Sequence, residues 1–145
     1  MRTIGLLSMG VLLLPAGVTT AQGPAESYQP VATMAQLMVD IIHPASNDIL
    51  LVINRGGPKD DTEWAALRRN AMTLAESGNL LMMRGRVREG DWIKDAKLLV
   101  DVGTAAYKAG QAKDANTLAG LTERVDAACV TCHKQYRPNV HPRTP

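Results

Sequence analysis

The chain has 145 residues, of which 46% are hydrophobic, and 16 Lys+Arg against 14 Asp+Glu give it a net charge of only +2. This length predicts a single domain, and the small charge argues against nucleic acid or another polyanion as the partner. With no Phe and two Trp, any core must consist mainly of Leu, Ile, Val, Ala and Met.

The first 21 residues have the pattern of a secretory signal peptide. Met1-Arg2 is a short basic start, residues 4–14 are largely apolar, and Thr19-Thr20-Ala21 offers small residues for cleavage. The apolar run is too short to span a bilayer comfortably. We therefore predict export to the periplasm, no stable membrane insertion, and one mature domain over residues 22–145.

The mature chain shows four amphipathic helical patterns and no strand pattern. The first covers about residues 31–53 and ends at Gly56-Gly57-Pro58. Pro44 interrupts this pattern. Because proline lacks a backbone N–H and disfavours helical geometry at His43, we expect a kink or a break there.

The other three helices are expected at about residues 61–83, 91–109 and 114–136. Gly110 is the predicted end of the third helix, and Pro138 stops the fourth. Four amphipathic helices joined by short loops predict an all-α, antiparallel four-helix bundle, the architecture in which cofactors lie between facing helices.

The loop between the second and third helices contains a basic cluster. Arg84, Arg86 and Arg88 alternate with other residues over this short stretch. Such a cluster is typical of a solvated loop, and the alternative is a docking patch for an acidic redox partner.

The fourth helix carries the motif Cys129-Val130-Thr131-Cys132-His133. Cys-x-x-Cys-His is the attachment signature of c-type haem. Residues at i, i+3 and i+4 share one helix face, so both thiols can add to the vinyl groups of one porphyrin while the imidazole reaches its iron. We therefore expect one covalently attached haem c, bound at Cys129 and Cys132, with His133 as an iron ligand.

Other functions of this cysteine pair stay open as alternatives. A zinc site would need further Cys or His ligands close by, and a thioredoxin-like pair would need a βαβ context. A structural disulfide, or a thiol–disulfide oxidoreductase using Cys129 and Cys132, is compatible with an oxidising compartment.

The position of this motif on the last of four helices, followed one turn later by Tyr136-Arg137, resembles the cytochrome c-prime group of class II c-type cytochromes. The resemblance covers the mature chain in architecture and only the last helix in motif. It implies that His133 is the proximal iron ligand and that Arg137 lies near the proximal side of the haem. It also allows a homodimer through the first two helices.

Members of this family differ at the sixth iron site. Many leave it open and bind nitric oxide or carbon monoxide, and low-spin relatives place a Met of the first helix on the iron. Here Met34 and Met38 share a face of an ideal α-helix, whereas His43 would point about 140° away from Met38. We predict Met38 as the ligand, and hence a one-electron carrier between periplasmic redox proteins rather than an enzyme. His43 as the ligand, and an open gas-binding site, are the alternatives.

Overall fold

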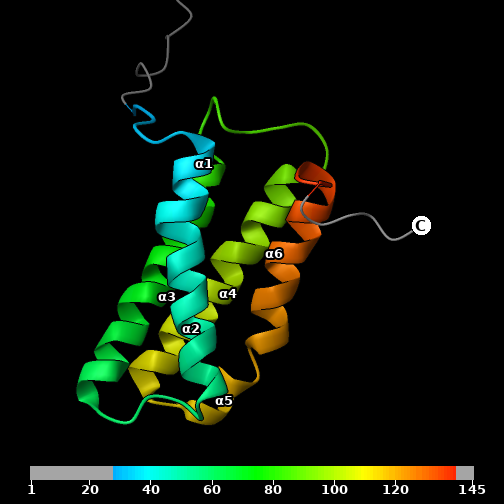
Figure 1. Ribbon diagram of the computed structural model, residues 1–145. Coiled ribbons are helices and arrows are strands. Elements are labelled where there is room, and N and C mark those ends of the chain that lie inside the picture. The colour runs from blue at the N-terminus through cyan, green and yellow to red at the C-terminus, as the bar shows by residue number, and fades with distance from the viewer. Residues whose placement is uncertain (1–27, 140–145) are drawn as a thin grey trace, which may run out of the picture.

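The computed structural model describes residues 28–139, so the predicted signal peptide lies outside the described residues. These residues form helices and no strand, which confirms the all-α prediction. Figure 1 shows the helices side by side along the length of the molecule. In chain order they are α1 (Met34–Gln36), η1 (Leu37–Ile42), α2 (His43–Asn54), α3 (Asp61–Leu81), α4 (Trp92–Ala112), α5 (Ala115–Ala119) and α6 (Thr122–Tyr136).

The segments α1, η1 and α2 join into one helix from Met34 to Asn54, so no break occurs at Pro44. Segment η1 is π-helical, and the N–H of His43 donates to the carbonyl of Met38, five residues earlier. In an α-helix the proline ring would clash with the carbonyl four residues before it. The wider π turn immediately before Pro44 accommodates the proline without ending the helix.

Local signals set the other boundaries of the first two long helices. At the start of α1, Thr33 and Gln36 form a reciprocal capping box. At the start of α3, the carboxylate of Asp60 accepts a hydrogen bond from the N–H of Glu63 at 2.9 Å, which satisfies an otherwise unpaired helix donor. Gly56-Gly57 follows α2, and both glycines have φ +89°, a conformation that favours glycine.

Helix α4 continues past Gly110, its predicted end, to Ala112. It stops at Lys113, which has a left-handed φ of 52°. The prediction failed because Gly110 serves a packing contact: a Cβ at this position would lie 2.9 Å from Cγ of Arg68 on α3. A small residue is therefore needed here within the helix.

The predicted fourth helix is two helices, α5 and α6, separated at Gly120 and Leu121. The N–H of Leu121 bonds to the carbonyl of Leu118, three residues earlier, in a tight turn. Glycine has low helix propensity, which favours the interruption. Helix α6 ends at Tyr136, and Arg137 has left the helical conformation, with φ −136° and ψ 55°. The proline that follows disfavours helical geometry at this residue.

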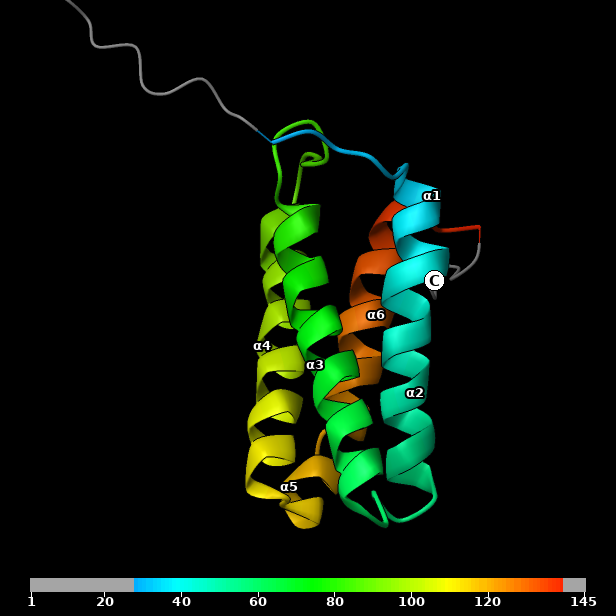
Figure 2. The same ribbon diagram turned by 90° about the vertical axis from the view of Figure 1, so that its left-hand side faces the viewer.

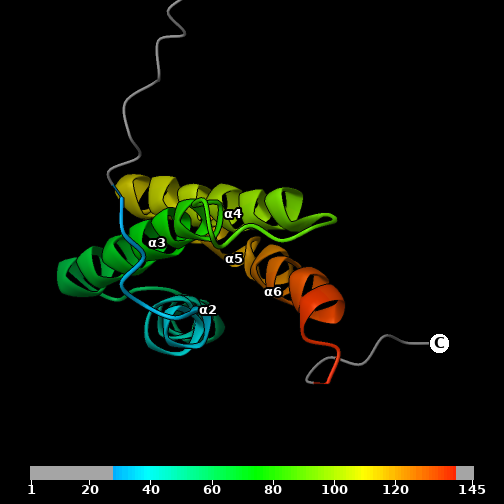
Figure 3. The same ribbon diagram turned by 90° about the horizontal axis from the view of Figure 1, so that it is seen from above.

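Helices α3 and α4 form the most closely packed pair. Gly78 and Gly103 lie where their backbones approach, and both are buried. Viewed from above, α2 and α6 both lie on one side of this pair (Figure 3). The start of α1, the loop after α3 and the end of α6 lie at the same end of the molecule (Figure 2).

The first helix, Met34–Asn54, is long and apolar enough by length and composition alone to cross a membrane, with a mean hydropathy of 1.2. It is amphipathic, however: Leu37 and Ile49 are buried in the core, whereas Asp40 and Asp48 are exposed. A core helix passes the same test, and the absence of membrane insertion stays a prediction.

The contact between α3 and α4 predicts the effect of Gly103→Ala. The added methyl would lie 2.5 Å from the backbone nitrogen of Ala75 and 2.8 Å from its Cα, so the two helices must move apart. We expect the free energy of unfolding to fall by about 1–3 kcal/mol, measured by urea denaturation. Gly120→Ala is the control, because its Cβ would have no neighbour closer than 3.5 Å. Equal stability of the two variants would contradict the close approach.

Candidate haem site

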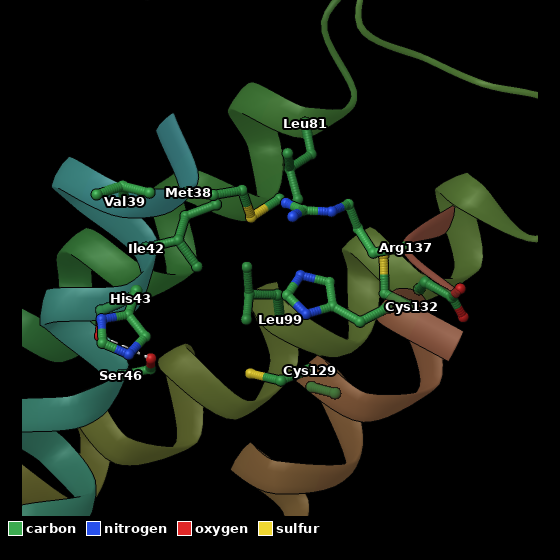
Figure 4. Close-up of a pocket in the computed structure, with 13 residues that line it drawn as sticks. Met38, Val39, Ile42, His43, Ser46, Leu81, Leu99, Cys129, Cys132 and Arg137 are labelled. Carbon is green, nitrogen blue, oxygen red and sulfur yellow. Dashed lines mark hydrogen bonds between the residues drawn. The ribbon is translucent and has the colours of Figure 1, made fainter. Parts of the chain in front are cut away.

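A cavity of about 300 Å³ lies between the first helix, α4 and α6. Figure 4 shows Met38 and His43 on one wall and Cys129, Cys132 and Arg137 on the other. His133 lines the same cavity. The structure therefore gathers every sequence-predicted site residue around one space. The remaining walls are mainly apolar and include Ile42, Leu81, Leu99 and Ala128.

Helix α6 presents the motif to this cavity. Val125 and Ala128 are buried and fix α6 against the rest of the core. Cys129, Cys132 and His133 follow them and are each only partly buried. The side chains of the motif therefore border the cavity rather than fill the interior, which leaves them accessible to a cofactor.

The π turn brings both candidate ligands of the first helix to the cavity. Met38 and His43 are joined by the five-residue backbone hydrogen bond of η1, so they lie one π turn apart. The expectation that His43 points away from Met38 assumed α-helical geometry and is wrong, since both line the cavity. Met38 is partly buried, whereas His43 is exposed, and this difference in burial favours Met38.

A second cavity, of about 240 Å³, shares Met38, Cys132, His133 and Arg137 with the first. Because these residues belong to both, the two cavities form neighbouring parts of one site. Arg88 lines the second cavity only. It adds a second guanidinium group beside Arg137, which lines both cavities.

An aromatic cluster positions Arg88. The indole N–H of buried Trp92 donates to the carbonyl of Leu81 at 2.8 Å, and the hydroxyl of Tyr136 donates to the carbonyl of Glu89 at 2.7 Å. The two rings meet edge to face at 4.8 Å, and the guanidinium of Arg88 lies 5.2 Å from the Trp92 ring. These contacts fasten the loop after α3 to the end of α6.

Arg86 is also part of the packed structure. Its guanidinium donates to the carbonyls of Ala32 at 3.0 Å and Leu80 at 3.3 Å, and so ties the segment before α1 to α3. The prediction of a purely solvated basic loop is wrong for Arg86, which is partly buried, whereas Arg84 is exposed.

Both cysteines are free thiols. Burial raises the pKa of Cys132 to about 11, with a smaller effect from the charge of Asp95, and burial also raises the pKa of Cys129. A thiol–disulfide oxidoreductase needs a thiolate stabilised by a low pKa. The environment of these thiols therefore argues against that function.

Sequence reasoning missed Asp95, which also lines the first cavity. Its side chain is 2% exposed, and neither carboxylate oxygen has a hydrogen-bond partner in the part of the chain that the structure describes. Burial raises its pKa, followed by the charge of Asp91. The signal was present in the sequence, because Asp95 interrupts the apolar stripe of Trp92, Ala96 and Leu99. An unpaired buried carboxylate at a cavity wall is what a missing binding partner would leave.

These residues fit a covalently attached haem. The two thiols have the correct spacing for the vinyl groups of that cofactor. The imidazole and the thioether on the facing wall suit its iron, and the two guanidinium groups suit its carboxylates. Comparison of the chain with protein-family models, curated proteins and solved structures gave no match. The case for haem therefore rests on the site itself.

The raised pKa of Cys132 predicts slow alkylation of the haem-free chain. With Cys129→Ser isolating Cys132, the rate with iodoacetamide at pH 8 should lie well below that of the same chain in urea, where a thiol has a pKa of about 8.5. The two rates should converge as the pH approaches about 11. Circular dichroism first establishes that the haem-free chain is helical, and equal rates at pH 8 would contradict the buried thiol.

Proposed function

We propose that this chain is an exported mono-haem c-type cytochrome, with an antiparallel four-helix bundle that carries single electrons between periplasmic redox proteins. One observation carries the proposal: Cys129, Cys132 and His133 on α6 line the same apolar cavity as Met38 on the first helix. The resemblance to the cytochrome c-prime group rests on the motif and on its place in the last helix of an all-helical chain.

Each wall of the site has a distinct role in this proposal. Cys129 and Cys132 would hold the cofactor through thioether bonds, and His133 and Met38 would bind its iron. Arg137 and Arg88 would pair with its carboxylates, since guanidinium groups bind carboxylates well. Bound there, haem supplies a one-electron redox couple, and the apolar walls exclude water from it.

Whether the thioether of Met38 binds the iron distinguishes electron transfer from gas binding. A thioether ligand favours the ferrous state and raises the reduction potential, and a filled sixth position leaves no site for a small ligand. Met38 is supported over Met34 because it lines both cavities, whereas Met34 lines only the second. If the sixth position were open, the same pocket would suit nitric oxide or carbon monoxide.

The first test of the proposal is covalent attachment. Protein exported by a host with cytochrome c assembly should have the mass of the mature chain plus one haem, retained after denaturation. The double variant Cys129→Ala/Cys132→Ala should lose the attached haem. Thr131→Ala, which changes an exposed residue inside the motif, should keep it. Haem that is extracted from denatured wild-type protein into organic solvent would contradict the proposal.

The second test concerns the sixth ligand. Met38→Ala should shift the visible spectrum towards high-spin iron, lower the reduction potential, and allow carbon monoxide to bind faster because no ligand bond must first break. Met34→Ala is the control and should change these properties only slightly, because Met34 does not line the first cavity. A changed spectrum in His43→Ala alone would assign the ligand to His43, and fast, tight binding of carbon monoxide by the wild type would favour a gas-binding function.

A further inference from the structure

We infer that Asp95 is the internal counter-charge of the oxidised haem and that its carboxylate lowers the reduction potential. This inference rests on the proposed function, because it requires a haem in the cavity. It assigns to α4 an effect on the reduction potential that the Cys-x-x-Cys-His motif and the first helix do not supply.

The position of Asp95 is the first observation. It lies in the first turn of α4, where its backbone N–H donates to the carbonyl of Asp91. Its side chain lines the first cavity and is 2% exposed. Cys132 of α6 lines the same cavity. Asp95 therefore shares the cavity with a cysteine to which the haem would be bonded, and its charge contributes to the raised pKa of the Cys132 thiol.

The absence of a partner is the second observation. Within residues 28–139, neither oxygen of Asp95 has a hydrogen-bond partner. The nearby cation Lys94 is exposed and lies 3.6 Å from Asp91 instead, and Arg88 lies over the ring of Trp92. Neither of these two cations makes an ion pair with Asp95 among the described residues, and the cavity retains a buried carboxylate without a hydrogen-bond partner.

An unpaired buried carboxylate is costly to the chain that carries it. The cost falls when a positive charge enters the cavity, because an opposite charge at close range favours the ionised carboxyl. With neutral His and Met ligands, ferric haem has one net positive charge at its centre and ferrous haem has none. The carboxylate of Asp95 therefore stabilises the oxidised state more than the reduced state, and its effect opposes that of the thioether of Met38.

A purely structural role makes a different prediction. An acidic residue in the first turn of a helix interacts favourably with the helix dipole, and the loss of that interaction would lower stability without changing the potential. Exposed Asp91 could serve the dipole equally well at this end of α4. The burial of Asp95 at the cavity wall is left unexplained by that role.

The test is a redox titration of the haem-loaded full chain at pH 7. Asp95→Asn, which keeps the shape and removes the charge, should raise the potential while the visible spectrum shows unchanged axial ligands. The control is Asp126→Asn: Asp126 lies three residues before Cys129 but is exposed, so water and salt screen its charge and the potential should change much less.

Asp95→Leu is the second variant, for the case in which Asp95→Asn does not fold. Leucine removes the charge and leaves no buried polar group at this position. It should also raise the potential, and both variants should destabilise the ferric form relative to the ferrous form in urea denaturation. An unchanged or lowered potential, or a spectrum that shows altered ligation, would overturn the inference. A wild-type chain without covalent haem would instead overturn the proposed function, which mass spectrometry determines beforehand.

Discussion

The close packing of α3 against α4 is the constraint on which the site depends. Buried glycines at positions 78 and 103 let the two helices approach until backbone atoms are in contact. The first helix and α6 pack on the same side of this pair (Figure 3). Leu99 and Asp95 of α4 then line the cavity between them, so the geometry of the site follows from a contact made outside it.

Pro44 affects the candidate site through the helix geometry that it requires. A proline inside a helix requires relief from the clash with the preceding turn, and here a π turn over Leu37–Ile42 provides it. That turn adds a residue to the helical repeat and brings Met38 and His43 to one cavity. Isolated π turns occur frequently at functional sites, and in this chain the proline gives a physical reason for one beside a predicted metal ligand.

The sequence predicted those parts of the structure that depend on neighbouring residues. Apolar periodicity located the long helices, and the Cys-x-x-Cys-His pattern singled out Cys129 and Cys132, which the structure places on one cavity. The packing role of Gly110 could not be predicted in this way, and for Asp95 the sequence shows an acidic residue within an apolar stripe but not its burial. Gly110 fits beside a side chain of another helix, and the burial of Asp95 depends on α6, which follows it by almost thirty positions. Local sequence patterns do not predict such contacts between distant segments.

The cavity also relates stability to cofactor binding. A space lined by apolar side chains forfeits packing contacts, and a buried carboxylate without a partner adds a desolvation cost. Both disadvantages are properties of the chain alone, and both diminish when a large apolar group with a positive centre occupies the site. Binding to the folded state alone stabilises that state. On the proposed function, the haem offsets the desolvation cost of the Asp95 carboxylate, and this carboxylate also lowers the reduction potential. Redox properties and folding then depend on the same contact.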